Sequence, residues 1–270
     1  MEIKKGDIKL LNDLLANEIG ISISNDKSSM LELRLSKRIN KLNLKNVNQY
    51  LDYISENSEE KNTLFNLLTT NYTKFFREKF HFEILFKKII PNILKNKNNN
   101  EINIWSAGCS TGEEPYTIAL LFAERNIEFN LLATDINTEV LKYAKNGIYS
   151  SQKTKNINSE YLHCYFQKGV GKYQGYYKIK ESLRKKIRFK KLNLNSSFST
   201  KLPKNFDIIF CRNVLIYFEN KKKRKILKEF RKTLTKSGFL VLGHSESIDL
   251  SIKSNLGWKK IDNNSYQKLG

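Results

Sequence analysis

The fold is decided by the stretch Ile104–Tyr116, which reads IWSAGCSTGEEPY. A short apolar run leads into a turn of small residues, and a helical pattern follows the turn. This order of strand, turn and helix is typical of a Rossmann-type sheet, where a ligand lies beyond the carboxyl ends of the strands. Small residues let a ligand approach bare backbone. A phosphate-binding loop would have Lys after Gly112, but this chain has Glu113, so the turn suits a cation or an amine.

Short apolar runs alternate with helical stretches from residue 102 onward. The alternation indicates an α/β sheet with crossover helices. The predicted strands are 102–106, 130–134, 187–192, 206–211 and 239–243. The predicted helices are 113–126, 138–146 and 220–234, with Gly238 as the cap of the last. The second strand ends at Asp135, where an acid is placed to bind the ribose hydroxyls of an adenosine ligand.

The rest of the sequence indicates how the chain is divided into domains. Apolar residues in residues 1–70 recur at helical spacing, which predicts a small all-helical domain. Residues 71–100 predict a linker, with a helix ending at Pro91 and then a polar loop. Residues 101–270 form the predicted α/β domain. Within it, glycines and aromatic residues alternate over about 165–179 and predict a small antiparallel insert, and residues 258–268 predict a terminal hairpin.

Composition excludes several classes of protein. The chain has 270 residues, 40% apolar content and 3 Pro, which argues against a disordered polymer. The 3 Cys form no CxxC pair, so neither a disulfide framework nor a zinc ribbon is indicated. The N-terminus lacks the apolar run of a signal peptide, and we expect a cytoplasmic protein. The net charge is +21, and residues 151–204 carry +12 of it, which could suit nucleic acid or a solvated surface.

Four strings carry most of the remaining information about function. They are TNYTKFFRE at 70–78, SAGCSTGEEPYT at 106–117, FCRNVLIYF at 210–218 and LGHSE at 242–246. Together with Asn193-Leu194, and in this order, they closely resemble the CheR-type chemoreceptor glutamate methyltransferases of bacteria. The resemblance spans nearly the whole chain.

The resemblance implies an S-adenosylmethionine-dependent enzyme that forms methyl esters on receptor glutamates and releases S-adenosylhomocysteine. It also implies a helical N-terminal domain, a Rossmann-like methyltransferase domain and a small β-subdomain inserted in the latter. Glu113 and Glu114 are adjacent, and the sequence leaves open which of them contacts the cofactor. By similarity, the cofactor-binding residues are Asn71, Thr73, Arg77, Glu113, Asp135, Asn193, Leu194, Arg212 and Asn213.

The implied partners are the cytoplasmic helices of methyl-accepting chemoreceptors. We expect no nucleic acid partner, no metal, no membrane insertion and a monomer. Cationic residues that share a stripe on a helix form the expected docking face, by resemblance and by electrostatics. They are Arg34, Lys37, Arg38, Lys41 and Lys45. The β-subdomain could add an edge strand for a receptor peptide.

Methyl transfer to a glutamate carboxylate needs little acid–base catalysis. A glutamate acceptor, with an ordinary pKa of about 4.3, is already ionised at neutral pH, so positioning matters more than a general base. We expect Arg77 to orient a carboxylate and Tyr217 to hydrogen-bond an oxygen of the attacking group. Each also has a purely structural interpretation, as a surface ion-pair partner and a buried aromatic residue. His244 and Cys109 are interpreted as a loop residue and a small buried residue.

Three alternative functions stay open. The basic charge favours an RNA or DNA methyltransferase, but the chain has no Asn-Pro-Pro-Tyr or Asp-Pro-Pro-Tyr box and no Pro-Cys motif. A non-catalytic module that binds S-adenosylmethionine is disfavoured by Arg77 and Tyr217. A carboxyl methyltransferase could also act on another signalling protein, because the catalytic motifs do not encode the protein substrate.

Overall fold

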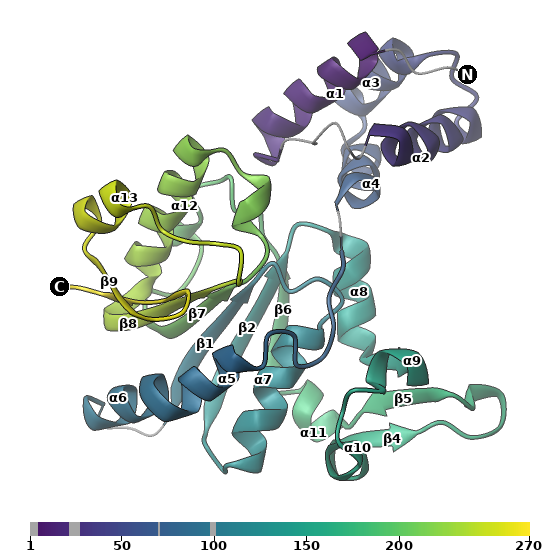
Figure 1. Ribbon diagram of the computed structural model, residues 1–270. Helices are drawn as coiled ribbons and strands as arrows, with labels where there is room; N and C mark the ends of the chain where they lie inside the picture. Colours follow the sequence, from purple (N-terminus) through teal and green to yellow (C-terminus); the bar gives the residue numbers. More distant parts are fainter. Residues whose placement is uncertain (1–4, 22–27, 70, 98–100) are drawn as a thin grey trace.

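The described residues of the N-terminal segment form four helices (Figure 1). The computed structural model describes residues 5–21, 28–69, 71–97 and 101–270. The side chains of Asn46 and Asn57 cap the third and fourth helices by accepting hydrogen bonds from first-turn amides. Apolar faces meet in a core around Leu11, Leu35 and Tyr50, which confirms the all-helical prediction. The helices are α1 (Lys5–Glu18), α2 (Ser28–Lys41), α3 (Val47–Glu56) and α4 (Ser58–Leu68).

The α/β part is built on a seven-stranded sheet within residues 101–270. The strand order is β6-β2-β1-β7-β8-β10-β9, and the first five of these strands are mutually parallel. Strand order therefore reverses between β1 and β7, which makes their carboxyl ends the switch point where ligands bind in such sheets. The strands are β1 (Ile102–Ala107), β2 (Phe129–Asp135), β6 (Ile187–Lys191), β7 (Phe206–Cys211), β8 (Leu234–Leu242), β9 (Trp258–Asp262) and β10 (Ser265–Lys268).

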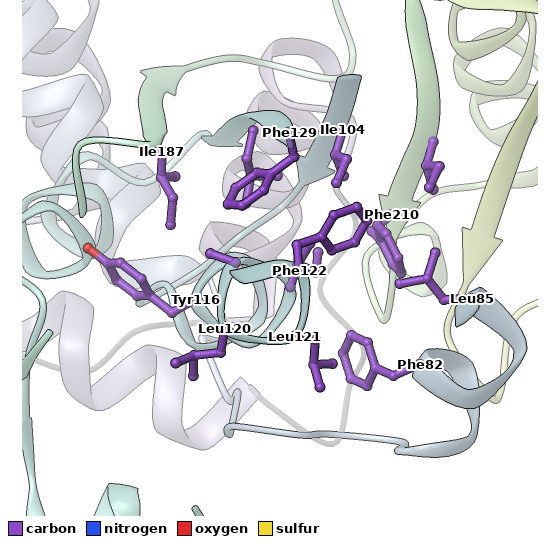
Figure 2. Packing of buried hydrophobic residues seen from close by; sticks show 14 of the residues in the cluster. Phe82, Leu85, Ile104, Tyr116, Leu120, Leu121, Phe122, Phe129, Ile187 and Phe210 are labelled. Atoms are coloured by element: carbon purple, nitrogen blue, oxygen red, sulfur yellow. The ribbon is translucent and has the colours of Figure 1, made fainter. Parts of the chain in front are cut away.

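Helices cover both faces of this sheet (Figure 1). Successive strand residues face opposite sides, so Ile104 packs in one core and Trp105 in the other. Figure 2 shows the first core, where the Phe122 and Phe129 rings meet edge to face with centroids 5.4 Å apart. This face carries α5 (Phe80–Ile84), the π-helix η2 (Leu85–Ile89), α6 (Ile90–Lys95), α7 (Glu113–Glu124), α8 (Thr138–Asn146) and α11 (Glu181–Arg184). The opposite face carries the 3₁₀ turns η4 (Phe198–Thr200) and η5 (Leu215–Tyr217), α12 (Asn220–Thr233) and α13 (Leu250–Asn255).

A second, antiparallel sheet has the strand order β3-β5-β4 and confirms the expected inserted β-subdomain. One of its strands, β3, lies before the range that the sequence predicted. The chain enters and leaves this subdomain between α8 and β6. Its elements are β3 (Ile148–Ser150), α9 (Ser151–Thr154), α10 (Ser159–Tyr165), β4 (Phe166–Lys168), η3 (Gly171–Tyr173) and β5 (Tyr176–Ile179).

Two details of the helix predictions were wrong. The helix does not end at Pro91, because the π-helix η2 runs directly into α6 and Pro91 lies in the first turn of α6. Gly238 does not cap α12, which ends at Thr233, and instead lies inside β8. A Cβ at Gly238 would approach Leu234 to 2.9 Å, so close packing explains this glycine. Among the described residues, no helix is long and apolar enough to cross a membrane.

Candidate active site

A cavity of about 290 Å³ lies at the carboxyl ends of the central strands. Its walls come from the β1–α7 turn, the ends of β2, β6 and β7, and η5. The helical domain adds Ile19 and Ile21, which follow α1, and residues of α2 and α4. Polar lining residues include Asn71, Thr73, Arg77, Glu114, Asp135, Asn193, Arg212, Asn213 and Tyr217, and apolar ones include Ile19, Leu68, Ile136, Leu194, Val214 and Phe218.

The floor of the cavity is the turn after β1. Gly108 has a φ of +83°, and a Cβ there would approach Val214 Cγ2 to 2.4 Å. The amides of Gly108 and Cys109 donate to the carbonyl of Thr134, which ties the turn to the end of β2. Burial raises the pKa of the Cys109 thiol well above its ordinary value, so this cysteine is a small packing residue, as expected.

Asp135 is fixed by backbone amides at the end of β2. Its Oδ2 accepts from Ser110 N at 2.8 Å and its Oδ1 accepts from Asn137 N at 2.9 Å. Burial raises the pKa of this carboxyl group, and the backbone hydrogen bonds oppose that rise. The acid lines the cavity at the position that the sequence assigned to it.

The two adjacent acids at the start of α7 point to different places. Glu114 lines the cavity, and its Oε2 accepts from Arg212 Nη1 at 3.0 Å. Glu113 is completely buried away from the cavity, where Lys153 Nζ and Thr111 Oγ1 each donate to its carboxylate at 2.6 Å. Neighbouring side chains diverge on a helix, and of these two acids only Glu114 lines the cavity. The assignment of Glu113 to the cofactor stays a prediction, and the geometry favours Glu114 as the contacting acid.

Arg77 lies in a turn with unusual backbone. Phe76 and Glu78, on either side of it, both have a φ of +55°, a conformation that costs free energy for residues with a side chain. Arg77 Nη1 donates to Tyr72 O at 3.0 Å, and its side chain is 27% exposed at the cavity. Neighbouring contacts must therefore hold the strained turn in place.

Glu78 supplies these contacts. Its Oε2 lies 3.2 Å from Arg212 Nη2 and accepts from the amide of His244 at 3.1 Å. Its Oε1 accepts from Asn213 Nδ2 at 3.2 Å. Burial would raise the pKa of Glu78, but its contact with His81 and the charge of Arg212 lower the pKa to about 2. Glu78 is therefore an anion at neutral pH that joins the Arg77 turn to the ends of β7 and β8.

Glu246 holds the loop that carries Tyr217. Its carboxylate accepts from four amides, those of Gly243, Asn213, Val214 and Ile216, at 2.6, 2.7, 2.9 and 3.2 Å. Burial raises the pKa of Glu246, and the amide hydrogen bonds oppose the rise. The loop after β7 is thus ordered by one carboxylate, and Tyr217 follows it at the cavity wall.

The helical domain closes the cavity through side-chain hydrogen bonds. Asn193 Nδ2 donates to Glu18 O at 2.8 Å, and Asn195 Nδ2 donates to Asn17 O at 3.0 Å. Asn137 Nδ2 donates to Thr69 Oγ1 at 2.8 Å, and its Oδ1 caps α8. The two parts of the chain therefore meet along the edge of the sheet that holds the cavity.

Comparisons with known proteins agree with this architecture. A family model described as the SAM binding domain of CheR methyltransferase matches residues 71–263, and one described as its all-alpha domain matches residues 6–69. The chain belongs to the CheR methyltransferase family. It is 38% identical over 263 residues to the chemotaxis protein methyltransferase of Borreliella burgdorferi, covering 92% of this chain and 90% of that protein. The protein of that name from Escherichia coli is 35% identical over 253 residues, covering 92% and 86% respectively.

As a CheR methyltransferase, the chain uses S-adenosylmethionine, and the cavity fits this cofactor chemically. Asp135 offers an acceptor for ribose hydroxyls, and Glu114 offers negative charge for an amine or sulfonium. Asn213 Oδ1 is buried and has no hydrogen-bond partner among the described residues, so it can accept from a bound ligand. Except for Glu113, the cofactor-binding residues implied by the resemblance all line the cavity.

The expected docking stripe is only partly available. Arg34 Nη1 donates to Leu67 O at 2.7 Å and lines the cavity. Arg38 forms an ion pair with Glu60, which is 4% exposed and also accepts from Tyr50 OH at 2.8 Å. Lys45 lies beyond the end of α2 at Lys41, so it does not continue the helical stripe. Lys37 and Lys41 of α2 are exposed and, among the described residues, form no ion pair or side-chain hydrogen bond.

Sequence reasoning assigned no role to Glu78 or Glu246. Both lie inside strings that carried the family resemblance, and this was the available signal. Their contacts are with backbone amides and an arginine far away in the sequence, so the strings alone could not reveal them. His244 is exposed, and its amide donates to Glu78, which agrees with its interpretation as a loop residue.

Proposed function

We propose that this CheR methyltransferase forms methyl esters on glutamate side chains of chemoreceptors. The observation that carries the proposal is that Arg77 and Tyr217 reach one cavity together with Glu114, Asp135 and Asn213. The names of the relatives, as chemotaxis protein methyltransferases, support a receptor substrate.

The proposed mechanism depends on positioning. When bound, S-adenosylmethionine supplies a methyl group on a positively charged sulfur, and the acceptor carboxylate displaces the neutral thioether. Arg77 orients the carboxylate, and Tyr217 donates a hydrogen bond to one of its oxygens. Glu114 and Asp135 hold the donor, and the helical domain excludes water from the reacting atoms. No residue has to remove a proton, because the acceptor is already ionised.

The position of Arg77 limits its strength as a carboxylate ligand. Its Nε lies 3.9 Å from Glu78 Oε1, so part of its charge is already balanced. An arginine that bound the acceptor too tightly would lower the reactivity of the nucleophile. The partial neutralisation by Glu78 therefore suits a residue that orients the acceptor.

We also propose that the reaction takes place in the cytoplasm and that Lys37, Lys41 and Lys45 help to dock the receptor. The three cysteines are free, which suits a reducing compartment. The three lysines are exposed near the helices that close the cavity. Exposed cations of this kind mainly increase the rate of association.

The test is transfer of labelled methyl from S-adenosylmethionine to chemoreceptor-containing membranes, followed by mild alkali. We expect a receptor-sized product whose label is released as methanol, as methyl esters require. Arg77→Ala and Tyr217→Phe should each lower the rate about a hundredfold or more, while Lys204→Ala, an exposed control, should not. Base-stable label, label on RNA, or label on a different protein would contradict the proposal.

A further inference from the structure

The most cationic element of the chain is α12, which the expected docking face did not include. It carries 8 Lys or Arg side chains and one acid, Glu229. That acid pairs with only one of these cations, since its buried carboxylate accepts from Lys232 Nζ at 2.6 Å and from Ser199 N at 3.1 Å, and the other seven have no acid on the helix. The helix is therefore a strongly positive outer layer beside the sheet (Figure 1).

The exposed cations of α12 lie on one face. Ile226, Leu227 and Phe230 are buried against the sheet, and Phe230 packs edge to face on Trp105. The exposed residues recur at helical spacing on the opposite side and extend over about 16 Å of helix. They are Lys221, Arg224, Lys225, Lys228 and Lys232. Within the described part of the chain, Lys221, Arg224 and Lys228 form no ion pair or side-chain hydrogen bond.

The row begins at the cavity. Tyr217 and Phe218 line the cavity, and α12 starts at Asn220. Lys222 Nζ donates to Ala16 O at 2.6 Å, so the first turn of α12 also contacts the helical domain. A polypeptide that brings a glutamate to Tyr217 would therefore lie near the start of this row.

We propose that the exposed row on α12 (Lys221, Arg224, Lys225, Lys228 and Lys232) docks an acidic helical segment of the protein substrate. The inference rests on the proposed function, since an acceptor region that offers glutamates carries the complementary charge. Arg38 of α2, which belonged to the expected docking face, is neutralised by Glu60. The row on α12 supplies exposed positive charge that Arg38 does not. A linear row of cations fits the carboxylates along one face of a helix.

The test compares two triple variants. The first changes Lys221, Arg224 and Lys228 to Glu. The matched control changes Lys95, Lys204 and Lys236 to Glu, which are also exposed but lie at the opposite end of the sheet, near the starts of β1, β7 and β8. Initial rates are measured against the concentration of a soluble cytoplasmic fragment of a chemoreceptor, at about 50 mM and about 500 mM salt.

At low salt we expect the α12 variant to have a KM for the fragment about tenfold or more above that of the unchanged chain. Its kcat and its affinity for S-adenosylhomocysteine, measured by calorimetry, should be unchanged, and the KM difference should shrink at high salt. The control should behave like the unchanged chain. If the α12 variant and the control have equal KM values, the inference is overturned.

Two further outcomes distinguish this inference from a failure of the proposed function and from binding to lipid. If the unchanged chain places no base-labile methyl on the receptor, the proposed function fails, whatever the variants do. Binding to vesicles that contain anionic lipid is measured in parallel. If the α12 variant loses only vesicle binding and keeps normal kinetics on the soluble fragment, the row binds lipid and the protein partner proposed here is wrong.

Discussion

Glu78 and Arg212 show how single residues prepare this cavity. Arg212 is 6% exposed and contacts Glu114, Glu78 and the carbonyl of Arg77. One buried cation thus joins the acid that faces the cavity to the turn that carries Arg77. A buried charge is stable only when it is paired. Removal of Arg212 or of Glu78 should therefore disturb both the acid that faces the cavity and the turn that carries Arg77.

The first prediction concerns Glu78→Gln, which keeps the shape of the side chain and removes its charge. The pKa of Glu78 is about 2 in the folded protein against an ordinary 4.5, so the folded state favours the carboxylate. Its stabilisation is present above pH 4.5 and is lost as the pH falls toward 2. We expect the variant to be less stable by about 1 to 3 kcal/mol at pH 7, with a gap that narrows at acid pH. Denaturant unfolding across this pH range measures the gap, and a gap independent of pH would contradict the assignment.

Among the elements, α2 has two different faces. Its buried face enters the core of the helical domain through Leu35 and Ile39. Its polar face is divided, since Arg38 pairs with Glu60 on α4 while Lys41 stays exposed. The Arg38 and Tyr50 hydrogen bonds overcome the effect of burial and lower the pKa of Glu60. Arg38 therefore belongs to the stability of the domain more than to its surface.

The second prediction separates these roles. Arg38→Ala leaves Glu60 without its cation, and we expect a loss of about 3 kcal/mol in the free energy of unfolding. Lys41→Ala, one turn further along, should change stability by less than about 0.5 kcal/mol. Chemical denaturation measures both variants. Equal stabilities would mean that the Arg38–Glu60 pair adds nothing to the fold.

The third prediction concerns the start of α8. Asn137 caps this helix and also donates to Thr69 in the helical domain. Asn158 caps α10 without such a link, so Asn158→Ala is a matched control. Asn137→Ala should cost about 1 to 2 kcal/mol of stability and also weaken binding of S-adenosylhomocysteine. If both variants bind the ligand equally well, the link does not support the cavity.

At the scale of the whole molecule, the cavity exists because two parts of the chain meet. The sheet supplies its floor, and the segment just after α1, together with α2 and α4, supplies much of its cover. Contacts between the parts include hydrogen bonds, such as Asn66 Nδ2 with Thr138 Oγ1 at 3.1 Å, and a small apolar cluster in which Ile136 packs with Ile19. Interfaces of this kind open more easily than a hydrophobic core, so ligand binding should stabilise the closed arrangement.

The fourth prediction follows from this closure. Binding of S-adenosylhomocysteine should slow amide hydrogen exchange in segments of both parts, namely 15–21 and 67–73 in the first and 107–112 and 212–218 in the second. Exchange in α6 and β9, which lie away from the cavity, should be unchanged. Mass spectrometry of peptides measures this directly. Protection confined to residues after 100 would show that the helical domain does not close over the ligand.

The sequence alone determined the element types. Strand and helix patterns are local, so the spacing of apolar residues was sufficient to predict the parallel strands, α7, α8 and the terminal hairpin. It also identified the strings that line the cavity and the family to which they belong. It failed at Pro91 and Gly238, because a proline or glycine has several structural roles that only its neighbours distinguish.

The tertiary structure decided what each charged side chain does. In the folded chain Glu114 faces the cavity and Glu113 does not, and Arg38 forms an ion pair with Glu60. Glu78 and Glu246 hold the turns that carry Arg77 and Tyr217. The tertiary structure also placed the cations of α12 beside the cavity. Most of these pairings join residues far apart in the sequence. Whether a charged side chain is neutralised by an ion pair or stays exposed for a partner depends on the residues that pack beside it. Local patterns carry no information about such neighbours.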